Sequence, residues 1–273
     1  MKVNLVDGCF YAFGGRSATL AGDRSGEGPV HFEWAEGPGG PITFYTDICL
    51  EQAIDVPGRK VAWLIEPPGA GRTHYGRAAD LHQHFEHILT YNALENGPNY
   101  FFYPLGGSWI KPEDWGLYRK DRAVSLILSD KNTTLGQQLR WRIYNEFQID
   151  AYGRGVNPID SKLEALADYH YSVVVESCQL NYYFSEKLID CLSCGTVPIY
   201  WGCPDIGRFF NPEGLITFET ADELDYILLN VVSERDYISR LPAIEENLER
   251  ARIYACAEDW LYKHYLFLFE GTK

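Results

Sequence analysis

Residues 182–202 (YYFSEKLIDCLSCGTVPIYWG) constrain the fold of this chain more than any other stretch. Ser185 is a good N-cap, and the apolar residues after it recur at helical spacing as far as Gly195, a residue type that commonly ends helices. This pattern predicts a helix over residues 186–194. The run at 197–201 is short, apolar and rich in β-branched and aromatic residues, which is typical of a strand buried on both faces. The stretch therefore predicts one helix–strand unit of an open parallel sheet.

Apolar runs of strand length recur along the rest of the chain. In the first part, separated by glycine and proline clusters, they occupy residues 3–6, 30–34, 42–45, 61–65, 88–91 and 100–103. In the second part, strands are predicted at 124–128, 149–152, 172–175, 197–201 and 215–218, helices at 135–147, 162–169 and 186–194, and a helical tail after a capping box at Thr220 and Glu223. This alternation predicts an α/β protein.

A glycine- and proline-rich segment near residues 106–118 separates the two series of strands and is the expected linker. We therefore predict an N-terminal α/β domain of residues 1–117. A C-terminal α/β domain of residues 118–273 is expected to end in helices. Ligands of such sheets bind at the carboxyl ends of the strands, so we expect the site in the cleft between the domains.

The charge and cysteine content narrow the partners that this chain can have. A formal net charge of −14, with no block of Lys and Arg, argues against a general nucleic-acid or anionic-membrane surface. No apolar run approaches 18 residues and the first ten residues lack signal-peptide features, so we expect a cytoplasmic chain without stable membrane insertion. The seven cysteines fit reduced thiols better than a disulfide framework, and Cys191 and Cys194 are expected to be core residues.

Residues 176–202 resemble the donor-binding signature of family 10 glycosyltransferases, the α1,3/α1,4-fucosyltransferases. In that signature an aromatic residue, two intervening residues and Glu-Lys precede an apolar helix and a Val/Ile-Pro strand, and the PIYWG ending is most similar to bacterial members. A weaker likeness continues through KVAWLIEPP at 60–68, VSLILSD at 124–130 and IDAYGRG at 149–155, so that it covers most of the chain after residue 55.

The resemblance implies a GT-B-like fold, with two Rossmann-like domains facing a cleft. It implies an inverting, metal-independent fucosyltransferase of glycan biosynthesis or protein glycosylation that uses GDP-fucose and an oligosaccharide acceptor, with no metal or other cofactor in the site. The second domain would hold the nucleotide sugar and the first would offer the acceptor surface and the base. By the same analogy, residues 258–269 would cross back to the first domain. The acceptor, the regiochemistry and the oligomeric state cannot be predicted from the sequence.

Glu66 directly follows the predicted strand at 60–65 and precedes Pro67-Pro68-Gly69, so a rigid loop would hold its carboxylate at the carboxyl end of the strand. The resemblance makes it the general base for the acceptor hydroxyl. Arg140 matches the family arginine that clamps the diphosphate, for which a planar guanidinium is well suited. Arg142 on the same predicted helix is its rival for this role.

Lys187 lies in the first turn of its predicted helix, where the helix dipole disfavours a cation unless an anion is close. A bound phosphate would be such an anion, although neighbouring Glu186 would also serve. The resemblance makes Lys187 a second cation at the phosphates and Glu186 the acceptor of hydrogen bonds from the ribose. Tyr183 would donate its phenol to the pyrophosphate or sugar, or simply pack at the start of the helix.

Ser177 departs from the family pattern, because the family commonly has Asn after the Glu of an F-E-N element and this chain has Ser177 after Glu176. A hydroxyl has fewer hydrogen-bonding groups than an amide, so one contact to the donor is expected to be lost or taken by water. Two alternatives therefore stay open. The chain would be a GT-B enzyme for another GDP-sugar, or an inactive nucleotide-sugar or glycan-binding protein.

The cluster at residues 80–87 (DLHQHFEH) favours a different class, because HxHxEH resembles the HxHxDH metal motif of metallo-β-lactamase-like hydrolases. That motif requires Asp in place of the Glu and should follow a strand, whereas this cluster leads into one. A polar helix face is the better interpretation. Motifs for dinucleotide-binding, P-loop and serine-hydrolase proteins are missing from the sequence.

Overall fold

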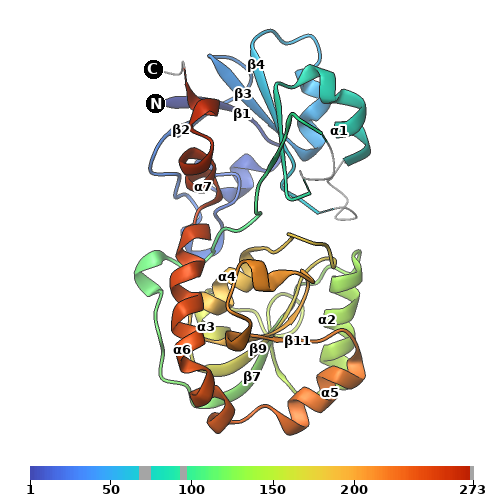
Figure 1. Ribbon diagram of the computed structural model, residues 1–273, viewed down its shortest axis with the longest axis vertical. Coiled ribbons are helices and arrows are strands. Elements are labelled where there is room, and N and C mark those ends of the chain that lie inside the picture. Colours follow the sequence, from blue (N-terminus) through green and yellow to red (C-terminus); the bar gives the residue numbers. More distant parts are fainter. Residues whose placement is uncertain (68–74, 93–96, 271–273) are drawn as a thin grey trace. The chain divides into compact units, whose positions relative to one another are not determined.

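The computed structural model describes residues 1–67, 75–92 and 97–270. Its contacts divide the chain into two units. The first unit comprises Met1–Gly107 and Cys256–Lys273, and the second comprises Ser108–Ala255. Each unit is built on one parallel sheet with helices packed against it, so the predicted α/β class is confirmed (Figure 1).

The sheet of the first unit has, in the described residues, six strands in the order β2-β1-β3-β4-β5-β6, all of them parallel. Their bounds are β1 Lys2–Val6, β2 Glu33–Glu36, β3 Ile42–Thr46, β4 Arg59–Trp63, β5 His87–Thr90 and β6 Tyr100–Phe102. The helices of this unit are α1 Tyr75–Leu81 and α7 Ala257–His264, with 3-10 turns that include η3 Asp47–Ala53, η4 His82–His84 and η10 Leu266–Phe269. All five residues of β3 are buried, as expected for a strand covered on both faces.

The sheet of the second unit has five strands in the order β11-β10-β9-β7-β8, again all parallel within the described residues. Their bounds are β7 Arg122–Ile127, β8 Asp150–Tyr152, β9 Tyr169–Val175, β10 Val197–Trp201 and β11 Ile216–Thr217. The helices are α2 Leu135–Glu146, α3 Leu163–Leu166, α4 Glu186–Ser193, α5 Ala221–Asn230 and α6 Glu234–Ala251. Two apolar clusters form its core, one containing α4 side chains and the other containing side chains of α2 and α5.

The helix–strand unit predicted at residues 186–201 is confirmed. The helix α4 spans Glu186–Ser193, its N-cap Ser185 accepts a hydrogen bond from the Lys187 N–H, and Gly195 follows with a left-handed φ of 63°. The strand β10 is buried at all five positions. The predicted capping box at Thr220 and Glu223 is present at the start of α5. These elements formed as predicted because their signals are local in the sequence.

The predicted helix at 162–169 is shortened to α3, and β9 starts at Tyr169 rather than at residue 172. The physical reason is long-range pairing. Strand β9 lies between β7 and β10, and Tyr169 is already paired with Arg122 of β7. Pairing with a neighbouring strand therefore overrides the weaker helical preference of these residues.

The structure differs from the predicted division at 117/118 in two respects. The first unit ends at Gly107, and residues 256–273 belong to it rather than to the second unit. The buried carboxylate of Glu258 explains the return of the chain, because it accepts hydrogen bonds from the Ser17 hydroxyl at 2.6 Å, the Ala18 N–H at 2.9 Å and the Thr19 hydroxyl at 2.6 Å. The return expected for residues 258–269 by analogy with the family is thus observed.

Gly136 on α2 allows that helix to approach the backbone just after β9. A Cβ at this position would lie 1.6 Å from the Glu176 carbonyl oxygen. We expect Gly136→Ala to lower the free energy of unfolding by about 3 kcal/mol, because either the helix or the loop must move. Urea unfolding followed by circular dichroism measures the loss. Gly207→Ala is the control, because nothing lies within 4 Å of a Cβ there; equal unfolding midpoints for the two variants would contradict this close approach.

Candidate functional site

Charged side chains gather where β9 ends and α4 begins, in the second unit. Glu176 is the first residue after β9 and is fully buried. Its carboxylate accepts hydrogen bonds from the Ser185 N–H at 2.8 Å and from the Ser185 hydroxyl at 2.6 Å. Burial raises the pKa of Glu176, whereas the nearby Lys187 ammonium and the Ser185 hydrogen bonds act to lower it. Through these hydrogen bonds to the N-cap residue Ser185, Glu176 connects the start of α4 to the carboxyl end of β9.

The Lys187 ammonium lies at the start of α4, surrounded by oxygen atoms that accept hydrogen bonds. Its Nζ is 3.1 Å from Glu186 Oε1, 3.0 Å from the Ser185 hydroxyl oxygen and 3.8 Å from Glu176 Oε2. Burial lowers the pKa of Lys187, but the charges of Glu186 and Glu176 outweigh it, so that the pKa lies above its ordinary value. Two carboxylates therefore hold this cation, rather than the single neighbouring Glu186 considered from the sequence.

Glu186 completes this group and stays ionised. Burial acts to raise its pKa, but Lys187 and then Lys162 lower the pKa to about 2. Lys162 precedes α3, and its Nζ lies 4.0 Å from Glu186 Oε1. An ionised carboxylate accepts hydrogen bonds and donates none, so Glu186 has the chemistry required to bind hydroxyl groups.

Arg140 and Arg142 are separated by the structure. Arg140 is buried on α2, its Nε donates to the Gly136 carbonyl at 3.3 Å, and its guanidinium lies within the electrostatic field of Glu176 and Glu186. Burial lowers its pKa. The Arg142 side chain is 59% exposed and pairs with Glu146 at 2.9 Å one turn along the helix. Arg140 thus belongs to the charged group around α4, whereas Arg142 faces solvent.

Tyr183 and Ser177 lie in the connection between β9 and α4. Tyr183 is almost fully buried and is close enough to act electrostatically on Arg140. Ser177 is half-buried, and its backbone carbonyl accepts the Gly136 N–H at 3.1 Å. The structure therefore brings five of the six predicted site residues together in the second unit: Arg140, Ser177, Tyr183, Glu186 and Lys187.

Glu66 lies in the first unit, shortly after β4 ends at Trp63. The N–H groups of Ile65 and Glu66 donate to the buried carboxylate of Asp47, at 3.0 Å and 3.3 Å. Burial raises the pKa of Asp47 well above its ordinary value, and the charge of Glu66 adds to the rise. The predicted rigid loop continues into Pro68 and Gly69, which lie outside the described residues. Glu66 is therefore held by its backbone at the carboxyl edge of the first sheet, as expected from the sequence.

The histidine cluster is divided between two elements. His82 and His84 lie on η4, and His87 begins β5. Glu86 pairs with Arg59 at 2.9 Å. Within residues 1–67, 75–92 and 97–270, no group of three His, Cys, Asp or Glu side chains is arranged to hold a metal ion. The hydrolase alternative therefore gains no support from the described residues.

The sequence also led us to expect reduced cysteines and no membrane-spanning helix. All seven cysteines are free, and Cys191 and Cys194 are buried in the core beside α4, as predicted. No helix in the described part of the chain has the length and apolarity needed to span a bilayer.

Two residues of the charged group were missed by the sequence analysis. Asp190 lies four residues after Glu186 and therefore on the same face of α4. The predicted helix over residues 186–194 was thus enough to place the two carboxylates together. Lys162 has no such signal, because 24 residues separate it from Glu186 and only the packing of the segment before α3 brings the two together.

The low pKa of Glu186 predicts how stability depends on pH. Its pKa falls from an ordinary 4.5 to about 2 in the folded chain, so its contribution is fully present above pH 4.5 and is lost as the pH falls towards 2. We expect the wild type to exceed Glu186→Gln in free energy of unfolding at pH 6, and this difference to shrink between pH 4.5 and pH 3. Urea unfolding across this range measures it, and a difference independent of pH would contradict the assignment.

Comparisons with known proteins find a family match that includes the residues of this charged group. Residues 117–241 match the family model described as glycosyltransferase family 10 (fucosyltransferase), C-terminal. An 87-residue segment, 30% of the chain, is 33% identical to α-(1,3)-fucosyltransferase FucT of Helicobacter pylori. The match spans 18% of that curated relative.

Solved structures are similar over much more of the chain. A crystal structure of an α1,3-fucosyltransferase superposes with a TM-score of 0.55 at 16% identity, covering 93% of this chain and 90% of that one. A second, with GDP-fucose, gives a TM-score of 0.54 at 13% identity and the same coverage. The crystal structure of TarM superposes with a TM-score of 0.58 at 12% identity, covering 84% of this chain and 55% of that one. These similarities establish the GT-B fold.

Proposed function

We propose that the chain is an inverting fucosyltransferase that moves fucose from GDP-fucose to a hydroxyl of a glycan acceptor. The premise is the match of residues 117–241 to the model of glycosyltransferase family 10. The fold of both units supports the proposal, because the α1,3-fucosyltransferase structure with GDP-fucose covers 93% of the chain. The chemistry of the charged group at α4 then assigns the roles.

The observation that carries the proposal is the state of Arg140. This side chain is only 6% exposed, yet among the described residues its only hydrogen bond is the one from Nε to the Gly136 carbonyl. Desolvating a guanidinium is costly unless its donors find acceptors. A diphosphate bound beside α4 supplies such acceptors in the bidentate geometry that arginine favours. The first N–H groups of the helix and the Lys187 ammonium add further donors.

The proposed reaction is a single displacement. Glu66 removes the proton of the acceptor hydroxyl while that oxygen attacks the anomeric carbon of fucose, and the bond from that carbon to the diphosphate oxygen breaks. GDP leaves with the bonding electrons, and Arg140 and Lys187 stabilise the charge on the diphosphate. Glu186 accepts hydrogen bonds from the ribose hydroxyls. In this scheme the two side-chain cations do the work for which other transferases use a metal ion.

A thermal-shift panel tests the donor assignment. We expect GDP and GDP-fucose to raise the melting temperature in the presence of EDTA, because a ligand at 100 times its Kd stabilises the fold by about 2.7 kcal/mol. UDP and UDP-glucose are the controls and should leave it unchanged. Stabilisation by UDP-glucose alone, or by zinc alone in a sample without EDTA, would overturn the proposal.

Ser177 favours a second candidate, a GT-B transferase for another GDP-sugar. Ser177 directly follows Glu176, at the position where the family commonly has Asn. Its hydroxyl is shorter than an amide and would offer the donor sugar different hydrogen bonds. Equal shifts with GDP-mannose and GDP-fucose, followed by transfer of mannose, would favour this candidate. Donor binding without transfer to any acceptor would instead support the nucleotide-sugar-binding alternative.

A further inference from the structure

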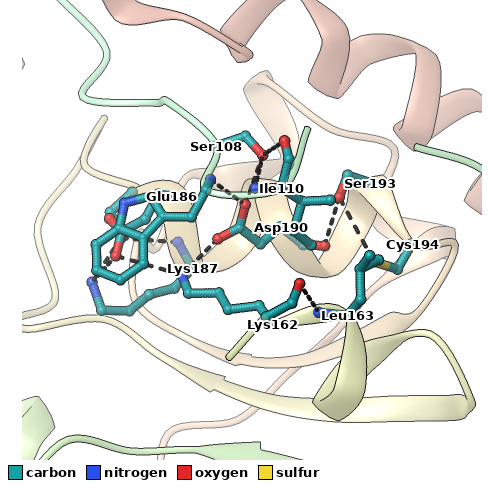
Figure 2. A network of polar contacts seen from close by, with 12 residues as sticks. Ser108, Ile110, Lys162, Leu163, Glu186, Lys187, Asp190, Ser193 and Cys194 are labelled. Atoms are coloured by element: carbon teal, nitrogen blue, oxygen red, sulfur yellow. Dashed lines mark hydrogen bonds and ion pairs between the residues drawn. The ribbon is translucent and has the colours of Figure 1, made fainter. Parts of the chain in front are cut away.

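A second cation, Lys162, lies beside Glu186 and is held there by a buried network (Figure 2). Its Nζ is 2.6 Å from Asp190 Oδ2 and 4.0 Å from Glu186 Oε1. The Trp109 ring covers the same ammonium, with its centroid 4.2 Å from Nζ. The Lys162 side chain is 13% exposed. A carboxylate and an aromatic face together fix this lysine in one place.

Asp190 is the anchor of the network. It lies one turn after Glu186 on α4 and is 1% exposed. Its Oδ1 accepts the Ser108 hydroxyl at 2.7 Å and the Trp109 N–H at 2.8 Å, which leaves Oδ2 for Lys162. Every oxygen of this buried carboxylate is therefore used. A carboxylate so constrained holds its cation in a defined position.

The charged side chains around Glu186 come from several elements: Arg140 of α2, Lys162 before α3, Glu176 after β9, and Lys187 and Asp190 of α4 itself. Among the described residues of this group, the three carboxylates balance the three cations. A diphosphate that attracts Lys187 would leave Glu186 without its nearest countercharge. Lys162 is the other cation that lies beside the same oxygen, Oε1.

We propose that Lys162 is a positioning residue that keeps the Glu186 carboxylate ionised and in place when a nucleoside diphosphate draws Lys187 away, with Asp190 and Trp109 holding Lys162 for this task. The proposal rests on the proposed function, in which Lys187 binds the diphosphate and Glu186 the ribose. It predicts that Lys162 affects nucleotide affinity only through Glu186 and without touching the ligand.

The test is a double-mutant cycle on GDP affinity, measured by titration calorimetry. Lys162→Gln keeps a hydrogen-bond donor for Asp190 but removes the charge, and we expect it to weaken GDP binding about tenfold. In a Glu186→Gln background the same change should have less than about a twofold effect, because an amide needs no countercharge. Lys162→Arg should restore most of the affinity. Lys263→Met, which removes an exposed lysine of α7 in the first unit, is the control for net charge.

A ligand-free measurement separates this proposal from the proposed function. In the Lys162→Gln variant, the folded-state pKa of Glu186 should rise, so the loss of stability that depends on Glu186 should be smaller and should be complete about one pH unit higher than in wild type. If the wild type does not bind GDP, the proposed function fails. The dependence of unfolding free energy on pH below 4.5, called the acid limb, then alone decides the role of Lys162. An unmoved acid limb, or equal losses of GDP affinity in both Glu186 backgrounds, would overturn the proposal and leave Lys162 a structural residue only.

Discussion

Replacing Glu66 with glutamine is expected to remove nearly all sugar transfer and to leave GDP binding almost unchanged. Glutamine has the same shape but cannot accept the proton of the acceptor hydroxyl, and the loss of a general base slows a reaction by about 10²–10⁴-fold. The Asp47 contacts use only the backbone N–H of Glu66, so they persist in the variant. Initial rates with GDP-fucose and calorimetric titration with GDP measure the two effects separately.

Glu86→Gln is the matched control for this experiment. Glu86 lies next to β5 of the same sheet and pairs with Arg59 in a half-exposed ion pair, so its replacement should change transfer by less than about twofold. An equal loss of transfer and of GDP affinity in Glu66→Gln would show that Glu66 supports the fold or the donor site rather than acting as the base.

Replacing Arg140 with alanine is expected to weaken GDP binding by about 1–3 kcal/mol, and Lys187→Ala should act similarly. The reason is that Arg140 is buried, that the Lys187 side chain is only 25% exposed, and that both cations would contact the diphosphate directly. The affinity for guanosine, which lacks the phosphates, should change little in either variant. Calorimetric titrations with GDP and with guanosine therefore separate a phosphate contact from general damage to the site.

Arg142→Ala is the control for Arg140→Ala, because Arg142 lies half a turn away on the same helix, faces solvent and pairs only with Glu146 in the described residues. Its loss should leave GDP affinity within about twofold of wild type. Unaltered GDP affinity in both Arg140→Ala and Lys187→Ala would rule out the phosphate roles. Loss of GDP and guanosine binding in parallel would point to a structural role for these cations.

The architecture of the second unit was largely predictable from the sequence. Its helix α4 and strand β10 carry local signals: an N-cap at Ser185, apolar residues at helical spacing, a left-handed glycine at 195 and a β-branched run after it. Signals of this kind act between residues close together in the chain, so they can be recognised without knowing how the rest of the chain folds. The candidate residues Glu186 and Lys187 were visible for the same reason, since both belong to the first turn of that helix.

Tertiary structure alone decided which residues surround those two. Arg140 and Arg142 are two positions apart on α2, so they point in different directions, and only the packing of that helix turns Arg140 inward. Lys162 approaches Glu186 through the anchor Asp190, across 28 residues of chain. The return of the chain to the first unit depends on Glu258 and Ser17, which are 241 residues apart. Contacts at such separations leave no periodic trace in a sequence, because they depend on where whole elements pack rather than on the preference of any one segment.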